Sequence, residues 1–575
     1  MKFARLALLI AATTLPTATP AQSTEPAAIE RLAAEEADNS KIMWLMHQIA
    51  DVHGPRLTGS PQLEAAANWA AATLRSWNLQ NVTLDAWNFG EPGWSNDLTE
   101  ASVVAPYKAP ILARPIPWTP STKGLITANM FLLEVPGIPP ASSGRIVEPL
   151  PSVSGSPGLP PPTVATPAAA IMPTRAELNA YLESVKNRVR GTIVLVGRHT
   201  SARPNFTPGP LRTSDEEWNR RFAASHASAP TSTPMPAPTG EAGRLDADEI
   251  DAEISHFLYA HGALARVYDS GEPRNLMRVQ NVGGYNRQPQ LPAIMLASAD
   301  YGRMARVLGD GTTVRMRLNV DNRFHPRGRT AHNVLAEIPG SDRKDELVML
   351  GAHFDSWAAG TGATDNGSGS AMMMEAIRLI QAAGLKPRRT IRLALWTGEE
   401  QGVFGSSSYV ERHFGSFEKP KPDYNRLSAY VNIDTGTGRP RGAVVFGPPA
   451  AAAKVAKIMT PFRPWGFMGA HPSGRRTLGG ADTGAFYRAG LPGIGLYQDP
   501  FDYGSTHHTN FDTYEEIYEP DLRAGAVEIA ALVYALATSD EMVPRYPARD
   551  MPAVMPDEPT AGRLQPGNPR GKSAQ

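Results

Sequence analysis

The stretch that decides the fold is LVMLGAHFDSWAAGTGATDNGSGSAMMMEAIRLIQAAGLKPRRTIRLALWTGEE, residues 347–400. Two apolar runs, LVMLGA and IRLALW, predict strands, and a Gly-rich loop follows the first of them. Residues 371–383 have the apolar spacing of a helix, and Gly384 is placed to end it. The order strand, loop, helix, strand predicts an open α/β sheet, in which the binding site lies beyond the carboxyl ends of the strands.

Side chains that can bind a metal follow both strands. A single one is usually structural, because such residues also form hydrogen bonds, cap helices and turns, or face solvent. Here all of them fall at the same end of successive strands, and two more candidates follow downstream, which favours a metal site. The proposed ligands are His353, Asp365, Glu400, Asp434 and His508.

Asp365 is the central candidate, because a carboxylate can bridge two metal ions with its two oxygens. One ion would take His353 and Asp434. The other would take Glu400 and His508, and each would keep an open position for water. Paired ions of this kind activate a water molecule and stabilise a developing tetrahedral centre, so we expect two zinc ions per chain and hydrolytic chemistry.

Two further carboxylates are assigned roles beside the ligands. Glu399 neighbours a proposed ligand but points elsewhere, because adjacent side chains diverge. It would act as general base, taking a proton from the water and delivering it to the leaving amine. Asp355 lies two residues after His353, on the same side of an extended segment, and would orient that imidazole, although the spacing also fits a helix or turn cap.

The composition favours a soluble globular protein of more than one domain. The 575 residues are 42% hydrophobic and 19% charged, and Lys+Arg equals Asp+Glu at 56 each, so no charge excess points to nucleic acid. Cysteine is absent, which excludes disulfides and thiolate ligands. Any metal must be held by His, Asp and Glu, which favours zinc, manganese or cobalt.

The N-terminus has the pattern of a secretory signal peptide at residues 1–21. Lys2 and Arg5 supply the positive region, and a short apolar run and small residues follow. The run is too short to span a bilayer of about 30 Å. We therefore expect an exported protein, periplasmic or secreted, without a membrane span.

The composition changes between about residues 108 and 327, where Pro, Ser and Thr become frequent and the helices short. We expect a smaller, mostly-β domain inserted there between two parts of the main domain, residues 22–107 and 328–540. The main domain is expected to be α/β, with a mixed, largely parallel sheet flanked by helices. Residues 541–575 are expected to form a poorly ordered, Pro-rich tail.

Five motifs resemble those of the co-catalytic zinc aminopeptidases: AHFDSW, GATDNGSG, WTGEEQGVFGS, NID and HHTNFDT. They occur in the family's order, and the resemblance covers nearly all of residues 25–538. The run GLKPRRTIRLALWTGEEQG is particularly similar to the branch that includes plasma glutamate carboxypeptidase, also called carboxypeptidase Q. The inserted segment resembles the protease-associated domain common in that branch.

The resemblance implies the same five zinc ligands, with Glu399 as base. Its pattern H-T-x-x-D-T selects His508 over the adjacent His507. Asp482, in GGADTGAF, stands where the family has a substrate-side acidic motif, but the surrounding residues differ and its role stays open. The implied activity is that of a di-zinc exopeptidase on short peptides or dipeptides with a free amino terminus, with the choice between aminopeptidase and carboxypeptidase undecided.

Two alternatives belong to other classes. A catalytically inactive binding protein on a peptidase scaffold would have lost ligands, and none is missing here. A glutaminyl cyclase-like acyltransferase would work with a single zinc, so a metal count distinguishes it. The expected partner is a short peptide substrate, with no nucleic acid and no membrane span, and a homodimer is considered.

Overall fold

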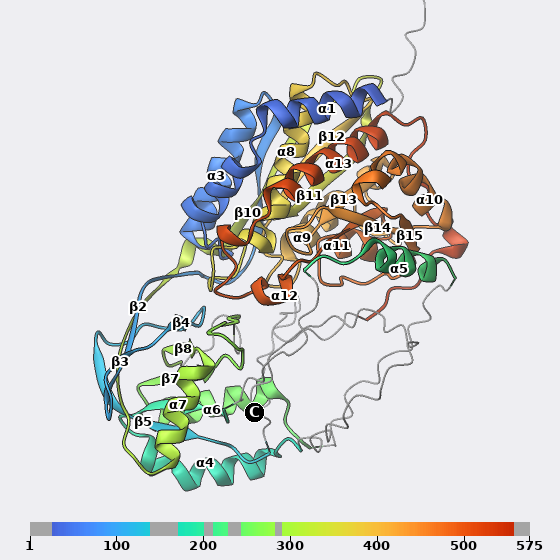
Figure 1. Cartoon of the computed structure of the whole chain (residues 1–575). Helices are drawn as coiled ribbons and strands as arrows, with labels where there is room; N and C mark the ends of the chain where they lie inside the picture. The colour runs from blue at the N-terminus through green and yellow to red at the C-terminus, as the bar shows by residue number, and fades with distance from the viewer. Residues whose placement is uncertain (1–25, 138–170, 200–210, 228–242, 282–289, 557–575) are drawn as a thin grey trace, which may run out of the picture.

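The computed structural model describes residues 26–137, 171–199, 211–227, 243–281 and 290–556. Two sheets form its framework, one above the other in Figure 1. The expected signal peptide at residues 1–21 lies outside the described residues. Within the described ranges, no helix has the length and apolar character needed to cross a membrane.

The upper sheet is mixed and largely parallel, as the sequence predicts. Four central strands run parallel, and antiparallel neighbours adjoin them on both sides. In spatial order the strands are β1 (Gln80–Asn88), β10 (Thr330–Ile338), β12 (Arg389–Trp396), β11 (Arg343–His353), β13 (Leu427–Ile433), β16 (Gly493–Gln498), β14 (Pro440–Phe446) and β15 (Ala470–Ser473).

Both faces of this sheet are buried, which explains the near-continuous apolar runs of its strands. In β10, Val334 and Ala336 face one core and Leu335 faces the other. The first face is covered by α1 (Pro26–Asn39), α2 (Ile42–Met46), α3 (Pro61–Ser76), α8 (Ser368–Ala382), α10 (Pro449–Ile458) and α13 (Glu519–Thr538). The second face is covered by α9 (Phe404–His413) and α11 (Thr483–Ala489).

Helix α8 links the core to the Gly-rich loop. It is buried from Ser368 to Ile380, so a helix that is apolar nearly all round fills the first face. Its one buried acid, Glu375, is held by the Arg378 guanidinium at 2.7 and 2.9 Å. Gly384 follows the helix end with a φ of 63°, which confirms the expected stop. Because the loop residues run directly into this buried helix, the core fixes their position.

The lower sheet also has eight strands. They are β3 (Ala109–Pro110), β2 (Gly93–Ala105), β9 (Arg315–His325), β5 (Ile126–Leu133), β6 (Ile193–Val196), β7 (Ala265–Asp269), β8 (Ala293–Leu296) and β4 (Ala113–Pro115). Helices α4 (Arg175–Val189) and α6 (Ala247–Ala260) pack on one face and α7 (Ser298–Gly309) on the other. The inserted unit is therefore a layered α/β unit with more helix than the mostly-β domain that we expected.

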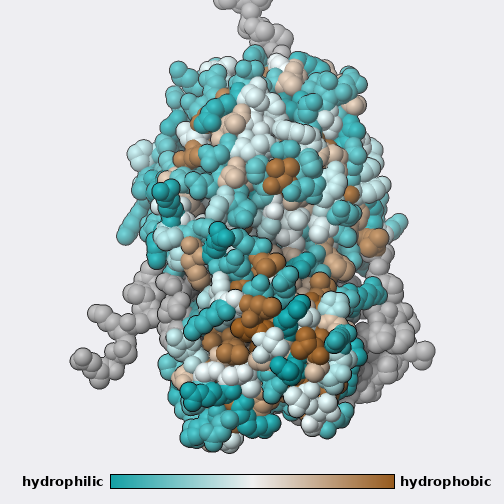
Figure 2. Space-filling view, turned by 90° about the vertical axis from the view of Figure 1, so that its left-hand side faces the viewer, coloured by the Kyte–Doolittle hydropathy of each residue, from teal (hydrophilic) through white to brown (hydrophobic). Residues whose placement is uncertain are grey.

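The lower sheet begins earlier than the expected insert at residues 108–327. Its strands β2 and β9 pair with each other from Gly93 to Ala105, and the sheet runs to His325. The Pro-rich composition begins only after β2, which is why the sequence placed the change late. Figure 2 shows one side of the molecule, where hydrophobic residues gather over the lower half, the inserted unit.

One helix of the inserted segment lies on the upper unit. α5 (Asp215–Ala227) runs beside β14 and β15 (Figure 1). Its Phe222 rests against Gly442 of β14, where a Cβ atom would stand 1.9 Å from the ring. Trp218 stacks on Phe222 with ring centroids 6.0 Å apart. The two units are therefore joined by this helix as well as by β2 and β9.

The segment 541–556 packs against the upper unit, so the expectation of a poorly ordered tail is wrong for these residues. Val543 is 2% exposed, and Arg545 donates to the carbonyl of Tyr424 at 2.9 Å. The Met555 amide donates to the Arg476 carbonyl at 2.8 Å. The rest of the tail, residues 557–575, lies outside the described residues.

Candidate metal centre

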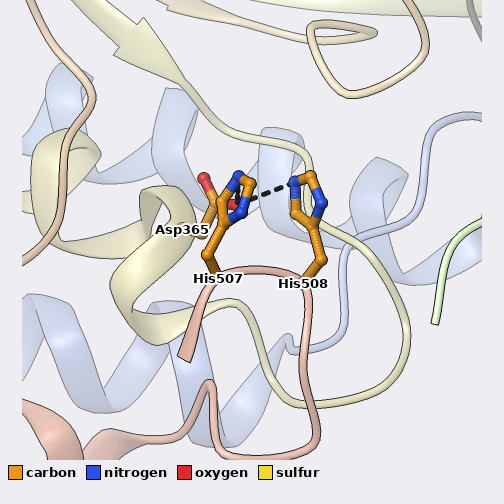
Figure 3. Close-up of side chains that lie close together, drawn as sticks. All are labelled: Asp365, His507 and His508. Atoms are coloured by element: carbon orange, nitrogen blue, oxygen red, sulfur yellow. Dashed lines mark ion pairs between the residues drawn. The ribbon is translucent and has the colours of Figure 1, made fainter. Parts of the chain in front are cut away.

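The five proposed ligands meet at the carboxyl edge of the upper sheet. His353 ends β11, while Glu400 and Asp434 follow β12 and β13. Because these strands are parallel neighbours, their ends lie at one edge. Asp365 reaches this edge from the loop before α8, and His508 from the loop after α12 (Tyr503–Thr506), as Figure 3 shows.

The carboxylate of Asp365 is shared by two groups of side chains. Its Oδ1 lies 3.2 Å from His353 Nε2, which lies 3.1 Å from Asp434 Oδ1. Its Oδ2 lies 3.1 Å from His508 Nε2, which lies 2.9 Å from Glu400 Oε2. The structure thus brings all five residues together and places the two expected pairs at different oxygens of Asp365.

Asp355 is in the site, but its carboxylate does not make the expected hydrogen bond. It is the backbone carbonyl of Asp355 that accepts from His353 Nδ1, at 3.0 Å, whereas Oδ1 stands 3.7 Å away. The carboxylate instead accepts the backbone N–H groups of Glu399 and Glu400, each at 3.3 Å, and the Thr58 hydroxyl at 3.0 Å. The spacing argument overlooked the carbonyl, which lies closer to the imidazole.

Arg56 holds the loop that carries Asp365, a role that the sequence did not reveal. Its guanidinium is fully buried and donates to the carbonyls of Phe354, Ile49, Thr361 and Gly362 at 2.7 to 2.9 Å. All four acceptors are backbone atoms, so no acidic partner in the sequence marks this contact. Both ends of the loop are thereby tied to one side chain.

Two further residues fix the neighbours of the ligands. Asn366 donates from Nδ2 to Asp434 Oδ1 at 2.9 Å. Asp512 accepts from the Thr364 hydroxyl at 2.9 Å, next to Asp365. Asn366 belongs to the motif GATDNGSG and Asp512 to HHTNFDT, and this membership was the only sign in the sequence that they contribute to the site. Nothing in the sequence marked two residues of the inserted unit that also contact this site, Arg278 and Gln280.

The buried ionisable groups of the cluster shift one another's pKa values. Burial opposes the charged imidazole of His508, but Glu400 and Asp365 raise its pKa to about 10. Burial raises the pKa of Glu400 to about 7 and that of Asp434 to about 6. Although burial opposes its ionisation, the imidazoles of His353 and His508 hold the pKa of Asp365 well below its ordinary value.

Glu399 and Asp482 are buried beside the ligands. Burial raises the pKa of Glu399 well above its ordinary value, and the charges of Asp434, Asp482 and Glu400 add to this effect. Burial also raises the pKa of Asp482 to about 8. The structure thus brings Asp482 near the proposed base, although its own role stays open.

The cluster fits zinc in the chemistry of its donors. Four buried carboxylates, Asp365, Asp434, Glu399 and Glu400, face two imidazoles, so bound cations would offset the excess of negative charge. Glu400 Oε1 is buried and accepts no hydrogen bond from any described residue. Imidazole nitrogen and carboxylate oxygen are the zinc donors that a chain without cysteine can offer.

A cavity of about 510 Å³ is lined by Thr364, which precedes Asp365, although none of the proposed ligands lines it. Thr364, Tyr503 and Thr506 line it next to the proposed ligands. Leu211 and Arg212, from the inserted segment just before α5, also line it. Both units therefore contribute to the space beside the candidate site.

The chain is similar to known proteins in sequence and in fold. Residues 333–533 match the model of peptidase family M28. Carboxypeptidase Q from Mus musculus is 32% identical over 257 residues, which cover 45% of this chain and 52% of that protein. The chain spans about half the length of the curated relatives it matches.

Solved structures share the fold across both units. The peptidase M28 precursor from Shewanella amazonensis superposes with a TM-score of 0.59 at 22% identity, covering 91% of this chain and 98% of that one. BSAP, a zinc aminopeptidase from Bacillus subtilis, gives 0.51 at 17% identity, covering 89% and 97%. The likeness of the inserted segment to a protease-associated domain stays a prediction. The part of the chain from residue 333 to 533, which carries every proposed ligand, is thus similar to peptidase family M28.

Proposed function

We propose that this protein is a zinc-dependent exopeptidase that hydrolyses short peptides or dipeptides. The observation that carries the proposal is the carboxylate of Asp365, whose two oxygens each face one imidazole and one further carboxylate. Zinc bound there would supply Lewis acidity, activating a water molecule and stabilising the charge of the tetrahedral centre. The two groups support two ions per chain.

The residues would divide between the two ions in the way that the sequence predicts. His353, Asp434 and one oxygen of Asp365 would hold the first ion. Glu400, His508 and the other oxygen would hold the second. The Asn366 amide and the Asp355 carbonyl orient the first pair through hydrogen bonds of 2.9 and 3.0 Å.

Glu399 is the proposed general base. Its carboxylate would take a proton from the attacking water and deliver it to the leaving amine. Asp355 fixes the peptide segment that carries it, through the N–H groups of Glu399 and Glu400. Burial of Glu399 raises its pKa, which suits a group that must hold a proton between two steps.

The substrate class rests on relatives and motifs. The relative from Mus musculus is named carboxypeptidase Q, and five motifs resemble those of zinc aminopeptidases, which act at a free amino terminus. We therefore propose a free amino terminus as the feature recognised. Export to the periplasm or beyond, and a homodimer, stay predictions.

A pair of substitutions tests this assignment. Glu399→Gln should keep zinc content near that of the unchanged protein while lowering the rate of dipeptide hydrolysis by about 10²–10⁴-fold, because only the base is lost. Glu400→Gln removes a ligand charge, so zinc affinity should fall first and activity with it. Full activity of Glu399→Gln, or loss of its zinc, would show that the two roles are wrongly assigned. Equal cleavage of the acetylated dipeptide would refute recognition of the free amine.

A further inference from the structure

A loop of the inserted unit reaches the candidate metal centre. It leaves the carboxyl end of β7 and pairs with the segment that carries both adjacent histidines. The Val279 amide donates to the His508 carbonyl at 3.0 Å. Met277 accepts from the Asn510 amide at 3.1 Å and donates to the Asn510 side chain at 2.6 Å. These backbone contacts hold the side chains of the loop against the two imidazoles.

Arg278 determines the proton position of His507. Its Nη1 lies 3.3 Å from His507 Nδ1 and also donates to the His507 carbonyl, while Nη2 donates to the Gly504 carbonyl at 3.0 Å. A guanidinium has donors only, so His507 Nδ1 must accept and the proton of the neutral ring lies on Nε2. That Nε2 faces Asp365 Oδ2 at 3.6 Å as an N–H group and has no lone pair for a metal.

Gln280 contacts the other imidazole, that of His508. Its carboxamide nitrogen, Nε2, lies 2.6 Å from His508 Nδ1. A carboxamide carries an acceptor oxygen and a donor nitrogen on one planar group, and turning the group over exchanges them. With the oxygen toward the ring, Gln280 accepts from Nδ1–H, and the lone pair of Nε2 is free toward Glu400 and Asp365. Partners that orient a ligand imidazole in this way raise its affinity for metal.

We propose that Arg278 and Gln280 of the inserted unit decide which of the two adjacent histidines binds zinc. Gln280 positions His508 as the ligand, and Arg278 keeps His507 out of the coordination shell. The inserted unit thereby completes a metal centre whose ligands all come from the other unit. This inference rests on the proposed function, in which His508 is a zinc ligand.

Two variants of Gln280 test the positioning. Gln280→Leu removes the acceptor at similar size, whereas Gln280→Glu keeps an acceptor at the same place. Zinc affinity of each full-length purified chain is measured by competition with a chelator. Gln280→Leu should bind about 10–100-fold more weakly than the unchanged protein, and Gln280→Glu at least as tightly as it. Unchanged affinity of Gln280→Leu, or an equal loss in Gln280→Glu, would overturn the positioning role.

Single substitutions of the histidines separate this inference from the proposed function. His508→Ala should lose one of the two zinc ions, and His507→Ala should keep both. If the unchanged protein binds no zinc, the proposed function fails. If it binds two and His507→Ala loses one, the proposed function stands and the assignment of the two histidines fails.

Discussion

Arg56→Met should loosen the loop that carries Asp365. The guanidinium is fully buried and forms hydrogen bonds to four carbonyls, from Ile49 to Gly362. Methionine fills a similar volume but donates nothing, so the four buried oxygens lose their partner. The loop then has to open or admit water to satisfy them.

The size of the effect follows from these contacts. A hydrogen bond from a charged donor contributes about 1.5–3 kcal/mol, so four of them give roughly 6–12 kcal/mol as an upper bound. Burying the guanidinium costs several kcal/mol, which the substitution recovers, and we expect a net loss of about 3–5 kcal/mol. A loss of this size raises the population of the open loop by at least about a hundredfold, since 1.4 kcal/mol is a factor of ten.

Hydrogen exchange of the loop amides in the metal-free protein measures this loss. The amides of Ser356, Thr361 and Gly367 are bonded within the region that Arg56 holds, and their exchange should accelerate by about a hundredfold or more. Arg549→Met is the matched control, because the Arg549 side chain is 87% exposed and its guanidinium pairs with the neighbouring Asp550. Exchange in Arg56→Met that matches the control would refute the reasoning.

Two other substitutions follow from packing and burial. Glu36 is 3% exposed and lies beside Glu375; its burial, and then its contact with Glu375, raise its pKa to about 8. The stability that Glu36 contributes is therefore present below about pH 4.5 and is lost as the pH rises through about 8. Glu36→Gln should raise the thermal midpoint relative to the unchanged protein at pH 9 and leave it similar at pH 5, and the opposite trend would contradict the burial argument. Phe222→Ala should weaken the contact of α5 with β14 by about 2–4 kcal/mol and expose residues 211–227 to limited proteolysis, while an unchanged cleavage pattern would show that α5 does not depend on this ring.

The sequence predicted the parts of the site that depend on strand order. The ends of β11, β12 and β13 lie together because parallel neighbours must, so His353, Glu400 and Asp434 could be placed before any coordinates. The family motifs then chose between adjacent residues such as His507 and His508.

The parts that the sequence did not predict depend on backbone groups and on distant loops. Arg56 binds carbonyls, and the Asp355 carboxylate binds N–H groups, so neither contact requires a complementary side chain that a pattern could reveal. Gln280 lies 228 residues from His508 along the chain, in a unit whose described residues hold no metal-binding cluster of their own. In the same way, the proline content of residues 541–556 concealed the packing of Val543 into the core.

Anomalous diffraction at the zinc edge, from crystals of the full-length protein grown with zinc, tests the central claim most directly. We predict two peaks about 3.5–4 Å apart, the spacing of co-catalytic metal pairs. The carboxylate of Asp365 should lie between them, with His353 and Asp434 on one and Glu400 and His508 on the other. A single peak, or two peaks without Asp365 between them, would contradict the two-metal account.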